Sequence, residues 1–224
     1  KFRRVGNQRV GDLAQFSQAA WGLMPSDKAV VFLENHDTAR DNTSLTYREP
    51  VRYRLAMTWL LGQPYGYPSI YSGYAFNRGS TAGNDMGPPS DAQGSTQAVR
   101  CAASLETIAF GDWTCEHRDP ALRAMVAFRK VVAGTDASRH WTDGANAVAF
   151  SRGDRGFVAI NANDARLDAA IPTGLAAGTY CDVLTGGRAG TSCVGTAVVV
   201  SATGVATIAL PAGTALAIHS ATRL

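Results

Sequence analysis

The chain has 224 residues, which is enough for one large domain or two small ones. Hydrophobic residues make up 46% of the chain and charged residues 17%, which excludes a disordered protein. The net charge is +3, Lys and Arg are scattered, and no apolar segment is long enough to span a bilayer. Neither a nucleic acid nor a membrane is therefore expected as a partner.

The first part of the chain is predicted to alternate helices with buried strands. Apolar spacing over 11–21 favours a short amphipathic helix, and the apolar run 30–33 is typical of a strand buried on both faces. A longer helix is predicted over 47–63, and a second strand over 66–73. A helix between two strands indicates a parallel crossover, as in α/β proteins.

The second part of the chain changes in character. Residues 77–99 are predicted as a long loop, and 120–132 as a helix with Asp119 as its N-cap residue. From about residue 138, charge falls, and short apolar segments alternate with turn signals, which favours an antiparallel β-sandwich. The expected strands are 147–150, 156–161, 180–184, 197–201, 205–210 and 215–219.

Three polar residues, Asn35, His36 and Asp37, directly follow the predicted strand at 30–33. In (β/α) barrels the carboxyl ends of the strands open onto the active-site face, so these residues are a candidate catalytic group. The alternative is a turn with a helix cap, because Asn and Asp both favour turns. The residues by themselves leave both interpretations open.

Four motifs in chain order resemble the alpha-amylases of glycoside hydrolase family 13. The run V-F-L-E-N-H-D at 31–37 is similar to the F-V-D-N-H-D signature of their seventh barrel strand. Residues 66–73 resemble the G-x-P-x-I-Y-x-G signature of the eighth strand. Segments 112–118 and 180–183 resemble stretches of the animal-type enzymes and their bacterial relatives. The similarity covers essentially the whole chain.

The resemblance implies a fold of the class α/β plus all-β. Residues 1–137 would be the C-terminal portion of a TIM (β/α)8 barrel, and 138–224 an antiparallel Greek-key β-sandwich domain. A complete barrel takes ~250 residues, so only part of one is expected here. Lys1 is not a Met, which favours an upstream part that this sequence lacks.

The resemblance also assigns roles. Retaining glycosidases use a nucleophile and an acid about 5 Å apart, and in the family both come from strands upstream of Lys1. Asp37 matches a third carboxylate that stabilises the charged transition state, and His36 and Asn35 match substrate-binding residues. Glu34 replaces the usual Asp and is expected to contact the site residues without contacting the sugar itself.

The implied activity is endo-hydrolysis of α-1,4-glucosidic bonds in starch or glycogen with retention. The implied partners are an α-glucan and the missing N-terminal part of the same enzyme. The alternatives are a non-catalytic starch-binding module and a related family 13 transglycosylase or glucosidase. Trp21, Trp59, Trp113 and Trp141 could be sugar platforms, and Trp113, in a loop, is the best surface candidate.

Two ions belong to the family. Its Ca²⁺ ligands lie mostly upstream, so no metal ligand is expected in this chain. Chloride-activated members hold the anion with the Asn at position 35 and a basic residue on the eighth strand, where this chain has Ser69. A buried anion without a cationic partner has a large desolvation cost, so chloride activation is not expected.

The four cysteines, Cys101, Cys115, Cys181 and Cys193, show no metal-binding spacing. Two local disulfides, Cys101–Cys115 and Cys181–Cys193, are the simplest pairing, and the second matches a bridge of the resembling family. Disulfides indicate a secreted, extracellular protein. The alternative is four free thiols in a cytosolic protein.

Overall fold

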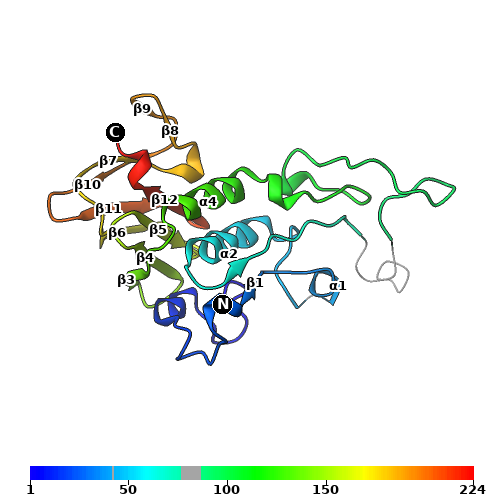
Figure 1. Cartoon of the computed structure of the whole chain (residues 1–224), viewed down its shortest axis with the longest axis horizontal. Coiled ribbons are helices and arrows are strands. Elements are labelled where there is room, and N and C mark those ends of the chain that lie inside the picture. Colours follow the sequence, from blue (N-terminus) through cyan, green and yellow to red (C-terminus); the bar gives the residue numbers. More distant parts are fainter. Residues whose placement is uncertain (42, 77–86) are drawn as a thin grey trace.

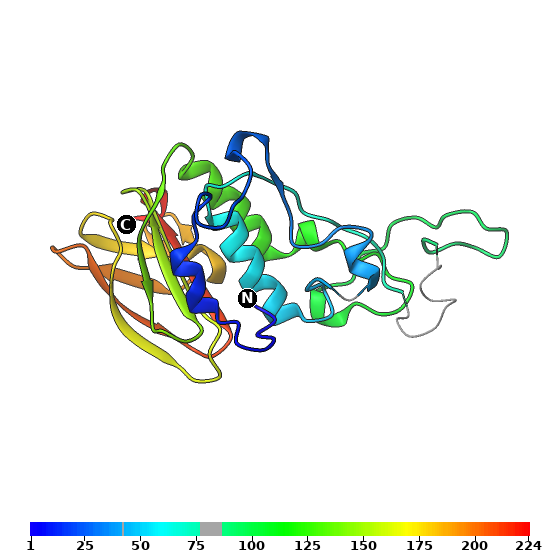
Figure 2. The ribbon, with the colours of Figure 1, turned by 90° about the horizontal axis from the view of Figure 1, so that it is seen from below.

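The structure is a computed structural model that describes residues 1–41, 43–76 and 87–224. Helices α2 (Pro50–Gly62) and α4 (Pro120–Val131) lie side by side and cover one face of a four-stranded sheet. A second four-stranded sheet lies on the other face of the first (Figures 1 and 2). The fold therefore has three layers, one of helices and two of antiparallel sheet.

The N-terminal part contains one parallel strand pair. It begins with two 3₁₀ helices, Val10–Gln15 and Ser26–Lys28, followed by strand β1 (Val30–Val31). Helix α1 (Thr38–Asp41) and helix α2 precede strand β2 (Tyr67–Pro68), which pairs in parallel with β1. The predicted parallel crossover through a helix is thus confirmed.

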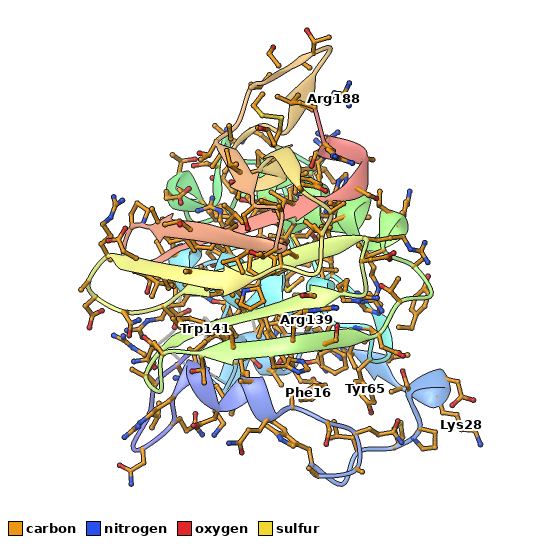
Figure 3. All side chains as sticks on the ribbon, turned by 90° about the vertical axis from the view of Figure 1, so that its left-hand side faces the viewer. Phe16, Lys28, Tyr65, Arg139, Trp141 and Arg188 are labelled. Atoms are coloured by element: carbon orange, nitrogen blue, oxygen red, sulfur yellow. A yellow bond between two sulfur atoms is a disulfide. The ribbon has the colours of Figure 1, made fainter. Side chains whose placement is uncertain are left out.

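Three predictions for this part were wrong in detail, and one of them is the strand over 66–73, of which only Tyr67–Pro68 is formed. The helix predicted over 11–21 is only the 3₁₀ helix Val10–Gln15, because Phe16 turns to an extended conformation. The ring of Phe16 then packs against Trp21, Trp59 and Tyr65, with centroid distances of 5.3, 4.9 and 5.8 Å. Figure 3 shows Phe16 and Tyr65 close together at the edge of the sheets.

The run 30–33 is not buried on both faces as predicted. The side chains of Val30 and Phe32 are 62% and 46% exposed, whereas Val31 and Leu33 line a cavity of about 370 Å³ together with residues of α2. The physical reason is that α2 lies on the side of Val31 and Leu33, and the side chains of Val30 and Phe32 have no such layer over them among the described residues. One face of this short pair is therefore uncovered.

The segment between the strand pair and α4 has little regular structure. It contains 3₁₀ helices Leu105–Thr107 and Glu116–Arg118, and residues 77–86 of the predicted loop lie outside the described residues. The helix predicted over 120–132 is confirmed as α4. Asp119 is its N-cap residue, because Asp119 Oδ1 accepts bonds from the N–H groups of Ala121 and Leu122.

The C-terminal part is the predicted antiparallel sandwich. The first sheet has the order β12-β5-β4-β3 and the second the order β6-β11-β10-β7, and a small hairpin of β8 and β9 follows β7 along the chain. The bounds are β3 Ala137–Thr142, β4 Ala147–Arg152, β5 Gly156–Asn161, β6 Leu167–Pro172, β7 Gly178–Cys181, β8 Arg188–Ala189, β9 Ser192–Cys193, β10 Ala197–Val200, β11 Val205–Leu210 and β12 Thr214–His219. Strands β3 and β6 and the short strands β8 and β9 are additional to the predicted strands. Residues Val183–Thr185 and Ser220–Thr222 form 3₁₀ helices.

The central strands β4 and β5 are buried at all twelve positions. One face packs on α2 and α4 and the other on the second sheet. The contact with the helices is very close. A Cβ on Gly62 would lie 2.9 Å from Phe150 Cζ, and a Cβ on Gly156 would lie 2.8 Å from Phe128 Cζ. The helices and the sandwich thus share a core, and the division at residue 137 stays a prediction.

A buried arginine joins the same layers. Arg152 on β4 is 2% exposed, and its guanidinium donates to the backbone oxygens of Gly62 at 2.6 Å, Val132 at 3.3 Å and Thr135 at 2.8 Å. These oxygens lie at or just beyond the C-terminal ends of α2 and α4, where helix carbonyls lack intrahelical donors. A cation is also favoured there by the helix dipoles. Burial lowers the pKa of Arg152 to about 10.

Candidate functional site

The three predicted site residues lie in a short turn between β1 and α1. Because β1 runs parallel to β2, this turn is at the carboxyl end of the strand pair, as the sequence predicts. Figure 1 shows α1 on the same side of α2 as the extended segment 87–100. The turn is therefore far in space from the sandwich.

Asn35 forms the helix cap that was the alternative interpretation. Its Oδ1 accepts bonds from the N–H groups of Asp37 at 3.0 Å and Thr38 at 2.9 Å. In return, Thr38 Oγ1 accepts a bond from Asn35 N–H at 3.0 Å. The cap fixes the backbone on which Asp37 stands. A cap and a catalytic group are thus compatible at this position.

His36 and Asp37 present their side chains to solvent. The two side chains are 76% and 75% exposed, and His36 Nε2 lies 3.5 Å from Asp37 Oδ1. An exposed carboxylate can accept hydrogen bonds from neighbouring hydroxyl groups, and the imidazole beside it can donate a hydrogen bond to such a group. Among the described residues, no side chains enclose this pair, and both remain exposed to solvent.

Two buried acids, Glu34 and Glu116, lie near Tyr53, and Glu34 directly precedes the turn. Glu34 is 3% exposed and lies beside Tyr53, whose pKa is raised by burial and then by the nearby charges of Glu34 and Glu116. Glu116 is 1% exposed and accepts a hydrogen bond from Thr114 Oγ1 at 2.6 Å. Burial raises the pKa of Glu116. The expectation that Glu34 lies beside the site residues fits this placement, whereas Glu116 was missed.

The predictions for chloride and for metal ions can be compared with the position of Ser69 and with the acidic, His and Cys side chains. Ser69 is exposed just after β2, and its N–H donates to the backbone oxygen of Val31 at 2.8 Å. Its side chain offers no positive charge to an anion, and the absence of chloride activation stays a prediction. In the part of the chain that the structure describes, no group of three or more His, Cys, Asp or Glu residues could hold a metal ion.

Both expected disulfides are formed. Cys101 is joined to Cys115 and Cys181 to Cys193, with Cα–Cα distances of 5.7 and 5.1 Å. The first bridge fixes the segment before α4, and the second joins β7 to β9. No helix among the described residues is both long enough and apolar enough to cross a membrane.

Trp113 is less exposed than its predicted role as a surface platform requires. Trp113 is only partly exposed, because its backbone forms isolated β-bridges with Tyr74 and Cys101. Its ring centroid lies 6.0 Å from that of Tyr74. The exposed tryptophan is Trp21, at 41%. Trp59 is partly buried beside Phe16, and Trp141 lies on the edge strand β3 (Figure 3).

Comparison with known proteins gives a consistent family. Residues 141–221 match the family model of the alpha amylase C-terminal all-beta domain. The chain is 40% identical to pancreatic alpha-amylase 2a5 of Mus musculus over 213 residues, which cover 91% of the chain and 41% of the relative. It is 39% identical to pancreatic alpha-amylase of Sus scrofa, over 99% of the chain and 45% of that relative.

A solved structure supports the same assignment. Alpha-amylase I from Eisenia fetida, a variant of which is known in complex with maltohexaose, superposes on 97% of the chain with a TM-score of 0.86 and 33% identity. The chain covers 46% of that structure, and thus spans less than half the length of the relatives it matches. The chain is therefore homologous to the C-terminal region of animal-type alpha-amylases of glycoside hydrolase family 13.

Proposed function

We propose that this chain is part of a secreted alpha-amylase that hydrolyses internal α-1,4-glucosidic bonds of starch or glycogen with retention. The observation that supports this best is the position of Asp37, an exposed carboxylate at the carboxyl end of a parallel strand, in an alpha-amylase homologue. The maltohexaose complex of the Eisenia fetida relative supports an α-glucan as the substrate.

Asp37 acts in this proposal as a fixed negative charge. The transition state of glycoside hydrolysis has oxocarbenium character, so a carboxylate held beside the sugar ring lowers its energy. His36, whose Nε2 lies 3.5 Å from Asp37 Oδ1, donates a hydrogen bond to a hydroxyl of the same sugar. The Asn35 cap holds the backbone of both residues in place.

The nucleophile and the general acid come from the remainder of the enzyme. Its barrel strands would cover the exposed apolar side chains of the β1–β2 pair, of which Val30 is 62%, Phe32 46% and Tyr67 76% exposed. Ca²⁺ would bind to that remainder, where it stabilises the fold. We expect no role for chloride, because Ser69 replaces the basic ligand of the family and supplies no positive charge.

The test is an assay of the full polypeptide that carries this chain. Maltoheptaose is incubated with the enzyme, and proton NMR follows the anomeric signals of the new reducing ends. We expect the α-anomer to appear first and internal bonds to be cleaved. Initial release of the β-anomer, or binding of starch without cleavage, would contradict the proposal. The second outcome would favour a starch-binding module.

The 224-residue chain alone serves as the control in that assay. We expect no hydrolysis from it, because Asp37 forms no covalent bond with the sugar in this proposal. Hydrolysis by the isolated chain would place a nucleophile within it and would contradict the assigned role of Asp37.

A further inference from the structure

Arg40 links the turn that carries Asp37 to a second segment of the chain. It belongs to α1 (Thr38–Asp41), and its N–H donates to the backbone oxygen of Asp37 at 2.9 Å. Its Nη2 donates to Tyr74 Oη at 2.5 Å. Its Cζ lies 4.8 Å from the ring centroid of Phe76 and 5.6 Å from that of Tyr74. One side chain thus bridges α1 and the segment that follows β2.

The segment that receives Arg40 is firmly attached. Ala75 N–H donates to the backbone oxygen of Asp112 at 2.8 Å, and Thr114 N–H to that of Gly73 at 3.0 Å. The Cys101–Cys115 disulfide closes the same region covalently. Segments 73–76 and 111–115 are therefore joined by backbone hydrogen bonds, and the disulfide attaches Cys101 to the second of them.

Phe76 is held by a second arginine as well. Arg48, just before α2, donates from Nη2 to the backbone oxygen of Phe76 at 2.7 Å, and its Cζ lies 4.6 Å from the ring centroid. Phe76 is buried, with 8% of its surface exposed, and its ring lies against the guanidinium groups of both Arg40 and Arg48. The aromatic residue that Arg40 contacts, Phe76, is therefore itself held in place by Arg48.

The turn at Asp37 needs such an attachment. A helix of four residues has almost no stability of its own, since nucleation is unfavourable. His36 and Asp37 are exposed and so contribute little packing. In catalysis, a displacement of about 1 Å can reduce the rate by roughly 10²-fold. A group that fixes α1 therefore also fixes the reacting geometry.

We propose that Arg40 is a positioning residue that fastens the Asp37 turn to Tyr74 and Phe76. It acts through α1 and does not touch the sugar. The proposal rests on the proposed role of Asp37. The planar guanidinium suits this task, because it can stack on a ring and donate to a hydroxyl at the same time, which an ammonium group cannot do equally well.

The first experiment measures amide hydrogen exchange in this chain and needs no enzymatic activity. Arg40→Met is compared with the wild type, and Arg52→Met, an exposed position on α2, is the matched control. We expect exchange of residues 36–41 to become about tenfold faster in Arg40→Met only. Unchanged exchange at 36–41 would overturn the proposal.

The second experiment measures kcat and KM for maltoheptaose in the full polypeptide. We expect Arg40→Met to lower kcat at least about tenfold with little change in KM, and Arg40→Lys to recover part of that loss. Tyr74→Phe should add little to Arg40→Met, because both remove the same hydrogen bond. A raised KM with unchanged kcat would show a substrate contact and would overturn the positioning role.

The two experiments separate the two proposals. A wild-type polypeptide without α-glucan hydrolysis would contradict the proposed function. The exchange rates at 36–41 would still decide whether Arg40 fastens the turn.

Discussion

The central sheet and the β1–β2 pair use similar apolar sequences with opposite results. Strand β4 contains A-V-A-F at 147–150, and all of these residues are buried. The run 30–33, V-V-F-L, is also apolar, yet Val30 and Phe32 are 62% and 46% exposed. The difference is that β4 has α2 and α4 on one face and the second sheet on the other. Burial here depends on the neighbouring layers, and not on the strand's own sequence.

The largest effect is expected from Phe150→Ala. Phe150 is fully buried against the end of α2, so its loss removes apolar contacts and leaves a cavity. We expect the free energy of unfolding to fall by about 3–5 kcal/mol, measured by urea denaturation. A loss below about 1 kcal/mol would mean that α2 does not pack on the sheet as described.

A smaller but still large effect is expected from Arg152→Met. The substitution keeps much of the volume but leaves carbonyl groups at the ends of α2 and α4 without their donor. We expect a loss of about 2 kcal/mol in the same measurement. Arg123→Met, on the exposed side of α4, is the control and should change stability by less than about 0.5 kcal/mol. Equal effects for the two variants would contradict this role of Arg152.

The pH dependence of stability should differ in sign between two carboxyl groups. Burial raises the pKa of Asp182, although Ala217 N–H and Leu184 N–H donate to its Oδ1 and Thr185 Oγ1 donates to its Oδ2. The folded state therefore holds this proton more tightly than the unfolded state. Its stabilising contribution is complete below about pH 3.9 and is lost as the pH rises through the higher folded pKa.

Asp182→Asn does not titrate, so its stability relative to the wild type should increase between pH 3 and 7. Glu106→Gln should show the opposite trend. Arg54 beside Glu106 lowers the pKa of that carboxyl to about 2, which stabilises the fold above about pH 4.3, and this stabilisation is lost as the pH falls towards 2. Urea denaturation across this pH range tests both trends, and parallel curves for the two variants would contradict the assignment.

The smallest effect is expected from Phe32→Ala. In this chain its side chain is half exposed, so the free energy of unfolding should change by no more than about 0.5 kcal/mol. In the full polypeptide the same substitution should cost about 1.5–3 kcal/mol, because further barrel strands would bury the ring. Equal costs in both contexts would show that this face stays uncovered.

The sequence was sufficient for elements with strong local signals. Helix α4 begins at the predicted cap residue Asp119, and both disulfides join cysteines that are near in sequence. Strands β3 and β6 were missed, because their polar and charged side chains, such as those of His140 and Asp168, hide the apolar pattern of edge strands. Burial of 30–33 was overestimated, since a strand's sequence does not report which layers cover it.

For the site, the motif placed Asn35, His36 and Asp37 at the carboxyl end of β1, where the structure has them. The motif could not reveal Arg40, because its role depends on Tyr74 and Phe76, more than thirty residues away. Glu116 was missed for a related reason. Its burial results from the packing of the segment before α4, which has no periodic signal.

The most direct test of the proposed role is kcat of Asp37→Asn in the full polypeptide on maltoheptaose. The side chain is 75% exposed, so the variant should fold normally. We expect a loss in kcat on the order of 10²–10³-fold, because a neutral amide cannot stabilise the positive charge of the transition state. A kcat within about twofold of the wild type would contradict the proposed role.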